Sequence, residues 1–337
     1  MMPHGLACLF IGCGLVGAAP VPESLIPLVR ERLSWKVEGT IIKSKLAFSP
    51  DAKVLATIVN DDVRLREVRT GMILFDLRGS LTDPNDIAFS PDGQTLAVGG
   101  NDEIQLWNTR TGQLRSSLKE DDLGKIWQMI YTPDGKTLVF AADGLVRVWN
   151  PASDKQSTSL YEKPRNIPRL AMPSDGHTLA ISTEESHDDR DFVKIEIWDL
   201  KKRMITATWN DDDAERHPFV FFQPDGKVLL SVTWFSPTSG IRRWDVRTRK
   251  AIGVPVKFHA NGLPTAIAPD GKSFVLEDRD TDNLSLRDVV TGNLIAELPG
   301  HEIFIQSVAF SKDGRTLATS DGDGVTKIWA VRQPLTK

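Results

Sequence analysis

Short apolar segments separated by tight turns run along most of the chain, and the turns recur at a nearly constant interval. The turns read FSPDA at 48–52, FSPDG at 89–93, YTPDG at 131–135, MPSDG at 172–176, FQPDG at 222–226, IAPDG at 267–271 and FSKDG at 310–314. In such turns Pro presets φ, Asp bonds the local backbone and Gly accepts a positive φ, so the acids are expected to form turns rather than to catalyse a reaction. The Asp residues lie 41, 42, 41, 50, 45 and 43 positions apart. A period of this size, built from strand-like units, predicts a propeller rather than a helical solenoid.

A second apolar segment follows each turn, and in most units it carries Trp. These Trp segments are IQLWN (104–108), VRVWN (146–150), IEIWD (195–199), IRRWD (241–245) and TKIWA (326–330). Their apolar residues alternate with Gln, Arg, Glu or Lys, as expected for a half-buried strand. In the first and sixth units, Glu67 and Arg287 are predicted to stand in place of Trp. Each unit is therefore predicted to supply four short strands, which we label a to d from the propeller axis outward.

These segments resemble the repeats of the WD40 family, in which a unit opens with Gly-His and ends with Trp-Asp. Trp-Asp occurs at Trp198-Asp199 and Trp244-Asp245, and Gly-His occurs at Gly300-His301. The resemblance covers residues 33–331 and implies an all-β fold, a seven-bladed β-propeller with four-stranded antiparallel blades. In the last blade it implies a hydrogen-bonded tetrad of His301, Thr319, Asp323 and Trp329. The other six blades depart from the family pattern, which puts such tetrads in doubt there without threatening the fold.

The ends of the repeat region predict how the ring closes. The last unit ends after strand c, at Trp329-Ala330-Val331, and leaves no room for an outer strand of its own. Residues 33–37 (LSWKV) precede the first strand a, just as residues 294–298 precede the last one. We therefore predict that residues 33–37 form the outer strand of the seventh blade, which removes an exposed sheet edge.

The N-terminal segment differs from the rest of the chain. Residues 6–19 (LACLFIGCGLVGAA) form an uncharged apolar run, which is too short to span a bilayer as a helix because that needs about 20 apolar residues. The run matches the core of a secretory signal peptide, although no Lys or Arg precedes it. We expect residues 1–19 to be a signal peptide, 20–32 a linker and 332–337 a C-terminal tail, in a chain exported to the periplasm or the cell exterior. The alternatives are a buried N-terminal strand, or an uncleaved tail on a cytoplasmic chain.

Composition and charge narrow the choice of partners and cofactors. The net charge of −4 and the pI of about 5.9 argue against nucleic-acid binding, which needs a basic domain or stripe. Both cysteines, Cys8 and Cys13, lie in the apolar run. A cleaved chain would therefore contain no disulfide and no Cys-based metal site, and no cofactor is expected.

The charged residues are predicted to separate between the two faces of the propeller. In the family the d–a and b–c loops share one face, which we call the loop face, and here those loops carry mainly Asp and Glu. The a–b and c–d turns share the opposite face, the turn face, and carry mainly Lys and Arg. The candidate interaction face, where the acidic loops are longest and two aromatic residues resemble an interface anchor, comprises Asp188, Asp189, Asp191, Asp211, Asp212, Asp213, Trp234 and Phe235. The alternatives are a solvated charged surface, and a Trp234 that packs against its own blade.

Calcium binding and catalysis are the remaining possibilities. Residues 278–283 contain Asp278, Asp280 and Asp282 at the spacing of a calcium loop, but they lack the Gly and the bidentate Glu that such loops use. No catalytic motif is present, and the predicted strands a are mostly apolar, whereas propeller enzymes place polar clusters near the axis. We therefore predict a non-enzymatic scaffold that binds a protein or peptide partner through its acidic loop face. The alternative is an exported propeller enzyme similar to lactonases, or a calcium-dependent binding protein.

Overall fold

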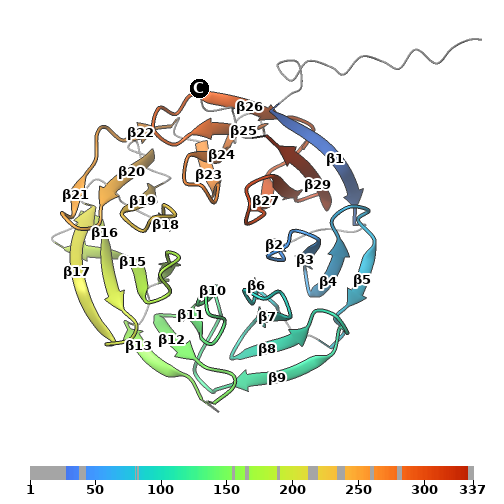
Figure 1. The fold of residues 1–337 in the computed structure, drawn as a ribbon, viewed down its shortest axis with the longest axis horizontal. Coiled ribbons are helices and arrows are strands. Elements are labelled where there is room, and N and C mark those ends of the chain that lie inside the picture. The colour runs from blue at the N-terminus through green and yellow to red at the C-terminus, as the bar shows by residue number, and fades with distance from the viewer. Residues whose placement is uncertain are drawn as a thin grey trace, which may run out of the picture.

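The chain forms a ring of seven antiparallel β-sheets, each of which is one blade of a β-propeller (Figure 1). The computed structural model describes residues 28–37, 43–79, 81, 83–153, 156–163, 167–187, 190–211, 219–233, 240–258, 262–278 and 283–332. Within these ranges there is no helix, and so none of the length and apolar character needed to cross a membrane. The predicted all-β, seven-bladed fold is confirmed.

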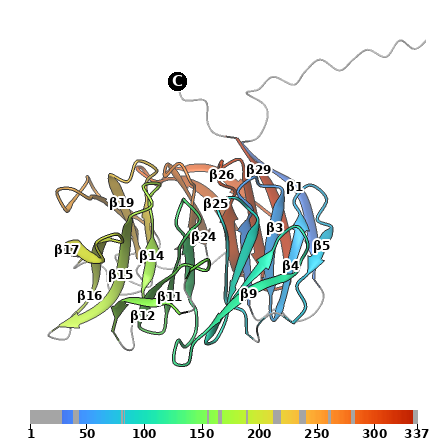
Figure 2. The same cartoon turned by 60° about the horizontal axis from the view of Figure 1, so that its bottom comes forward.

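The blades follow one another along the chain, and strands a to d run from the axis to the rim. Blade 1 contains β2 (Ser44–Phe48), β3 (Val54–Val59), β4 (Asp62–Glu67) and β5 (Ile73–Asp76); blade 2 contains β6 (Asp86–Phe89), β7 (Thr95–Gly99), β8 (Glu103–Asn108) and β9 (Leu114–Lys119). Blade 3 contains β10 (Gln128–Tyr131), β11 (Leu138–Ala142), β12 (Leu145–Trp149) and β13 (Thr158–Glu162); blade 4 contains β14 (Arg169–Ala171), β15 (Thr178–His187), β16 (Arg190–Asp199) and β17 (Met204–Asp211). Blade 5 contains β18 (Phe219–Phe222), β19 (Val228–Thr233), β20 (Gly240–Asp245) and an outer strand split into β21 (Lys250–Ala251) and β22 (Val256–Lys257). Blade 6 contains β23 (Gly262–Ile267), β24 (Ser273–Asp278), β25 (Asn283–Asp288) and β26 (Leu294–Leu298); blade 7 contains β27 (Ile305–Phe310), β28 (Thr316–Asp321), β29 (Val325–Val331) and β1 (Val29–Lys36). Figure 2 shows the strands running between the two faces of the ring, which places loops and turns on opposite faces.

The repeated acids act as turn formers, as blade 2 illustrates. The Ser90 hydroxyl donates to Asp92 Oδ1 at 2.6 Å, and the Gln94 N–H donates to the same oxygen at 3.0 Å. Because these bonds stabilise the ionised carboxylate, they hold the pKa of Asp92 below its ordinary value. Gly93 follows with a φ of +70°, which glycine adopts at little cost.

Neighbouring blades pack face to face through apolar side chains of strands b and c. Leu106 of blade 2 and Phe140 of blade 3, for example, share one buried cluster, and full burial of such a side chain contributes roughly 1.5–3 kcal/mol. Turn glycines allow the close approach. Gly112 has a φ of +67°, and a Cβ on it would lie 2.6 Å from Cδ1 of Phe75 in the preceding blade. The turn residues therefore also serve blade packing.

The N-terminal strand closes the ring, as predicted. Strand β1 pairs with β29 from Val29↔Val331 to Lys36↔Val325 (Figure 1). The strand begins four residues before the predicted residue 33, so residues 29–32, which the sequence analysis assigned to a linker, belong to blade 7. Trp35 on β1 reaches across the junction, where the guanidinium of Arg66 in blade 1 lies 5.3 Å from the centre of its ring.

Strand pairing corrects one position of the repeat alignment. In blade 7 Leu317 pairs with Trp329, and in blade 1 Leu55 pairs with Arg66. Arg66, not the predicted Glu67, therefore occupies the Trp position of blade 1. Its guanidinium donates to the carbonyl of Gly71 at 2.9 Å, so it holds the c–d turn of its own blade.

Candidate interaction sites

Blade 7 contains a buried hydrogen-bonded tetrad whose acid differs from the predicted one. The Trp329 indole N–H donates to Thr319 Oγ1 at 2.9 Å, and Thr319 Oγ1 lies 2.7 Å from His301 Nε2. His301 Nδ1 lies 2.6 Å from Asp321 Oδ2, so the tetrad acid is Asp321 and not Asp323. The Asp323 N–H instead donates to Asp321 Oδ1, because Asp321 ends β28 and Asp323 follows it in the b–c loop. Burial would raise the pKa of Asp321, but hydrogen bonds, chiefly with His301, hold that pKa below its ordinary value.

Blade 5 contains a related network that the sequence analysis did not predict. The Trp244 indole N–H donates to Ser231 Oγ at 2.9 Å, and the Ser231 hydroxyl donates to Asp211 Oδ2 at 2.9 Å. Arg242 forms an ion pair with the same carboxylate. Asp211 is only 1% exposed. Asp211 therefore ends β17 of blade 4 with its carboxylate buried against blade 5, and it does not present that carboxylate to a partner, which corrects its assignment to the candidate interaction face.

The structure leaves the rest of the predicted interaction face undescribed. Asp188, Asp189, Asp212, Asp213, Trp234 and Phe235 lie outside the described residues. Of Asp191 only the backbone is described, on strand β16. Residues 279–282 of the possible calcium loop are also outside the described ranges. Among the residues that the structure does describe, no group of three or more His, Cys, Asp or Glu side chains could hold a metal ion.

Polar side chains stand on the innermost strands, which the sequence analysis described as mostly apolar. They are Lys45, Asp86, Gln128 and Arg169 on β2, β6, β10 and β14. Lys45 Nζ lies 2.9 Å from Asp86 Oδ1, and the Met129 N–H donates to Asp86 Oδ2 at 2.7 Å. Gln128 exchanges two hydrogen bonds with the backbone of Leu170, at 2.8 and 2.9 Å. These contacts join blade 1 to blade 2, blade 2 to blade 3 and blade 3 to blade 4, and they satisfy backbone groups of the inner edge strands.

The described part of the loop face carries both paired and exposed acids. Lys43 and Lys125 both form ion pairs with Asp83, and Arg147 pairs with Glu120. The exposed acids of the loop face are Asp61, Asp62, Asp121, Asp122, Asp143, Glu302 and Asp323. Asp61 and Asp62 of this set also form ion pairs, with Lys43 and Arg64. The acidic character is therefore partly neutralised by Lys and Arg side chains, and the exposed acids are spread over blades 1, 2, 3 and 7.

An aromatic side chain on the loop face was missed by the sequence analysis. Phe304, in the d–a loop before β27, is 49% exposed, although Ile305 beside it is buried. The Gly322 N–H donates to the Phe304 carbonyl at 3.2 Å, and a Cβ on Gly322 would lie 2.7 Å from Phe304 Cζ. The b–c loop of the same blade thus positions the ring. The sequence does contain a signal for an exposed apolar side chain here, because residues 303–305 are three consecutive apolar residues. A strand points successive side chains to opposite faces, so not all three can be buried on one face.

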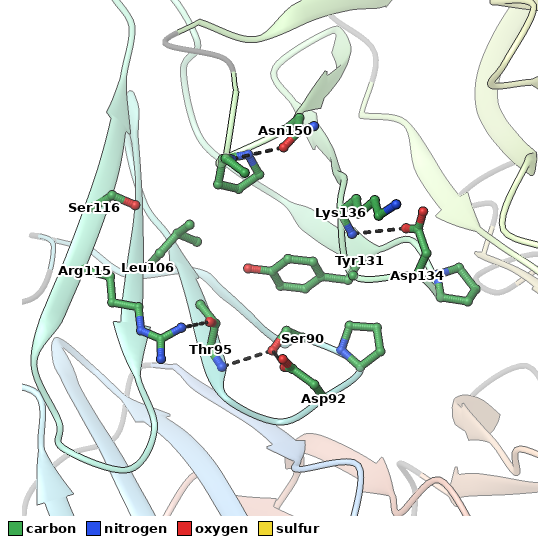
Figure 3. Close-up of a pocket in the computed structure, with 15 residues that line it drawn as sticks. Ser90, Asp92, Thr95, Leu106, Arg115, Ser116, Tyr131, Asp134, Lys136 and Asn150 are labelled. Carbon is green, nitrogen blue, oxygen red and sulfur yellow. Dashed lines mark hydrogen bonds between the residues drawn. The ribbon is translucent and has the colours of Figure 1, made fainter.

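On the turn face, a groove of about 750 Å³ separates blades 2 and 3 (Figure 3). Its apolar walls include Leu106, Pro91 and Pro133. Tyr131 lies in the groove with its hydroxyl directed toward Leu106 and Arg115, and Arg115 donates to Thr95 Oγ1 at 2.7 Å (Figure 3). From the sequence, only basic turns were expected on this face.

The family model for "WD domain, G-beta repeat" matches residues 71–108, 112–150 and 292–330. Each match begins at the c–d turn of one blade and ends on strand c of the next, so one sequence repeat straddles two blades. The chain is 23% identical over 177 residues to the Protein LST8 homolog of Drosophila melanogaster, covering 49% of this chain and 51% of that protein. It is 30% identical over 141 residues to the WD repeat-containing protein SL1-17 of Schistosoma mansoni (41% and 44%), and 24% identical over 174 residues to Autophagy-related protein 16 of Arabidopsis thaliana (52% and 32%). The matches span about half or less of the length of these curated relatives.

Proposed function

We propose that this chain, a seven-bladed propeller built from WD40 repeats, is a non-enzymatic scaffold that binds a protein or peptide partner through its acidic loop face. WD40-repeat relatives support the scaffold function in general terms. The observation that carries the choice of face is Phe304, a large apolar ring that is half-exposed on the loop face, in a loop that also carries the exposed Glu302.

Phe304 has the properties of an interface anchor. Its ring is 49% exposed, and the exposed acids Glu302 and Asp323 come from the same d–a and b–c loops of blade 7. Aromatic anchors surrounded by a polar rim account for much of the binding energy in protein interfaces. The surrounding acids favour a partner segment with Lys or Arg beside an apolar residue, and they should speed its association at low salt.

The position of Phe304 is set by the fold rather than by a partner. The backbone hydrogen bond from Gly322 joins the d–a loop to the b–c loop, and the tetrad around His301 lies directly beneath the same two loops. A rigid presentation of the ring reduces the entropy that is lost on binding.

Substitution of Phe304 tests the proposal against a matched control. Met204, at the start of β17 near the turn face, is 51% exposed and serves as the control. Proximity labelling in the native host, followed by pull-down with the purified chain, should identify a partner that binds wild type and Met204→Ala. Phe304→Ala should weaken that binding at least about tenfold, since truncation of an anchor costs about 2 kcal/mol or more. If Phe304→Ala retains the partner with unchanged affinity, the loop face is not the binding surface.

Export is a separate part of the proposal and rests on the apolar run at residues 6–19. Mass spectrometry of the chain purified from its host should give an N-terminus near residue 20. An intact N-terminus on a chain recovered from the cytoplasm would refute export.

A further inference from the structure

The groove between blades 2 and 3 contains a hydroxyl that the repeat does not require. Tyr131 ends β10, three residues before the turn acid Asp134. The residues at the same place in the other blades are Phe48, Phe89, Met172, Phe222, Ile267 and Phe310. The fold therefore needs an apolar side chain here, and only blade 3 adds a hydroxyl to it.

That hydroxyl has no hydrogen-bond partner among the described residues, and its oxygen is buried. A buried hydroxyl without a partner lowers the stability of the folded state. Burial, followed by the negative charge of Asp92, raises the pKa of Tyr131. The phenol therefore keeps its proton, and because its oxygen is covered by its neighbours, it can donate to a ligand once those side chains move apart.

A second departure from the repeat faces the same groove. Arg115 occupies the bulge of β9, between the pairs Trp107↔Leu114 and Leu106↔Ser116. The residues in the equivalent bulges of blades 1, 4, 6 and 7 are Leu74, Thr206, Ile295 and Arg32. In blade 7, Arg32 lies at the groove toward blade 1, where strand a carries Phe48 in place of Tyr. Each of these five blades (1, 2, 4, 6 and 7) forms a groove with the blade that follows it. Of the five grooves, the one between blades 2 and 3 combines an arginine in the bulge with a tyrosine hydroxyl on strand a.

We propose that this groove binds an extended peptide segment of a partner through a carboxylate, which accepts hydrogen bonds from the Tyr131 hydroxyl and the Arg115 guanidinium. One N–H of Arg115 already donates to Thr95, and a guanidinium has four more to offer. Paired charged and neutral donors of this kind suit the two oxygens of a carboxylate.

The remaining wall residues favour a peptide carboxylate over a phosphate. Asp92, Asp134 and one cation, Lys136, line the groove besides Arg115, and the two acids, which Lys136 balances only in part, repel a dianion more strongly than a monoanion. Pro91, Pro133 and Leu106 offer apolar walls to an extended chain, and a volume of about 750 Å³ is within the range of ligand sites. The site lies on the turn face and is therefore separate from the loop-face scaffold function proposed above.

An array of hexapeptides tests the proposal on the purified chain. Each peptide is made with a free and with an amidated C-terminus, and with Glu or Gln at each position, and binding peptides are measured again in solution by calorimetry. We expect peptides whose binding depends on a carboxylate. The amidated set and the Gln set show whether that carboxylate is the C-terminus or a side chain.

Two variants and two controls connect the binding to the groove. Tyr131→Phe should weaken it about fivefold to tenfold, because one hydrogen bond is lost, and Arg115→Leu should weaken it at least tenfold. Arg32→Leu removes the equivalent arginine from the groove between blades 7 and 1, which has no tyrosine hydroxyl, and should change the affinity for the peptide less than about twofold. Phe304→Ala on the loop face should leave it unchanged, so this result is independent of the scaffold proposal.

Stability supplies the second readout. Tyr131→Phe should unfold at the same or a higher urea concentration than wild type, because it removes an unpartnered buried hydroxyl and restores the residue found in four other blades. The proposal is overturned if no peptide shows carboxylate-dependent binding, if Tyr131→Phe and Arg115→Leu bind as wild type does, or if Tyr131→Phe is less stable.

Discussion

Removal of strand β1 should open the propeller ring. A chain that begins at residue 38 lacks β1, whereas a chain that begins at residue 25 keeps it. In the shorter chain β29 becomes an outer edge with unpaired N–H and C=O groups, and the apolar side chains that β1 buries are removed. We expect the shorter chain to be strongly destabilised and prone to associate with other copies.

The size of the effect follows from three side chains. Val29 is 8% exposed and belongs to the core of blade 7, whereas Leu33 and Trp35 are half-buried against Leu46 and Leu55 at the junction with blade 1. With about 1.5–3 kcal/mol for a fully buried apolar side chain and half of that for each half-buried one, the loss is about 3–6 kcal/mol. This is a large part of the 5–15 kcal/mol that typically separates folded from unfolded protein.

Urea denaturation followed by far-UV circular dichroism measures the difference, since that signal does not depend on Trp35. With an m-value of about 3 kcal/mol/M, the midpoint of the shorter chain should fall by about 1–2 M, and the longer chain should match the full sequence. A synthetic peptide of residues 28–37 should raise the midpoint of the shorter chain, because it can add back the missing strand. Equal midpoints for the two chains would falsify the closure by β1.

Two further perturbations test the turns and the tetrad. The bond to His301 holds the pKa of Asp321 below its ordinary value of 3.8. The ionised carboxylate therefore stabilises the fold fully above that value, and this contribution is lost as the pH falls through the lower folded-state pKa. In urea melts between about pH 5 and 2.5, Asp321→Asn should lose less stability than wild type does, and parallel pH profiles would contradict the role of this carboxylate. Gly112→Ala should cost more stability in thermal melts than the control Gly79→Ala. Both glycines have a positive φ, but only at Gly112 would the added Cβ also lie against Phe75. Gly79→Ala should lose about 1 kcal/mol and Gly112→Ala at least about 2 kcal/mol, and equal losses would show that the clash is relieved at no cost.

Most of the fold could be predicted from the sequence because its signals are local. The Pro-Asp-Gly turns and the alternating strands each depend on a few consecutive residues, and their period determines the number of blades. The pairing of β1 with the last blade was predicted from a missing strand at the other end of the repeats. The predicted strand was too short at its N-terminus, because residues 29–32 contain mostly charged side chains and show no apolar period.

Details of the sites were harder to predict because they depend on geometry within a loop. Asp321 and Asp323 are both near His301 in the predicted hairpin, and only the path of the b–c loop decides which carboxylate reaches the imidazole. Asp211 appeared in the sequence as the first of three consecutive acids. Its burial became evident only when Ser231 and Arg242 of the next blade were placed beside it.

The sequence by itself determined that this protein is a ring of seven blades, since turn chemistry and alternation act over a few residues and their period gives the number of blades; the resemblance to the WD40 family implied that loops lie on one face and turns on the other. Only the tertiary structure decided which side chains meet across blades. Tyr131 and Arg115 belong to different blades, and no spacing in the sequence encodes the distance between them. Their shared groove exists because sheet twist and blade packing bring side chains from separate blades together. The exposed ring of Phe304 depends instead on how two loops of blade 7 lie against each other.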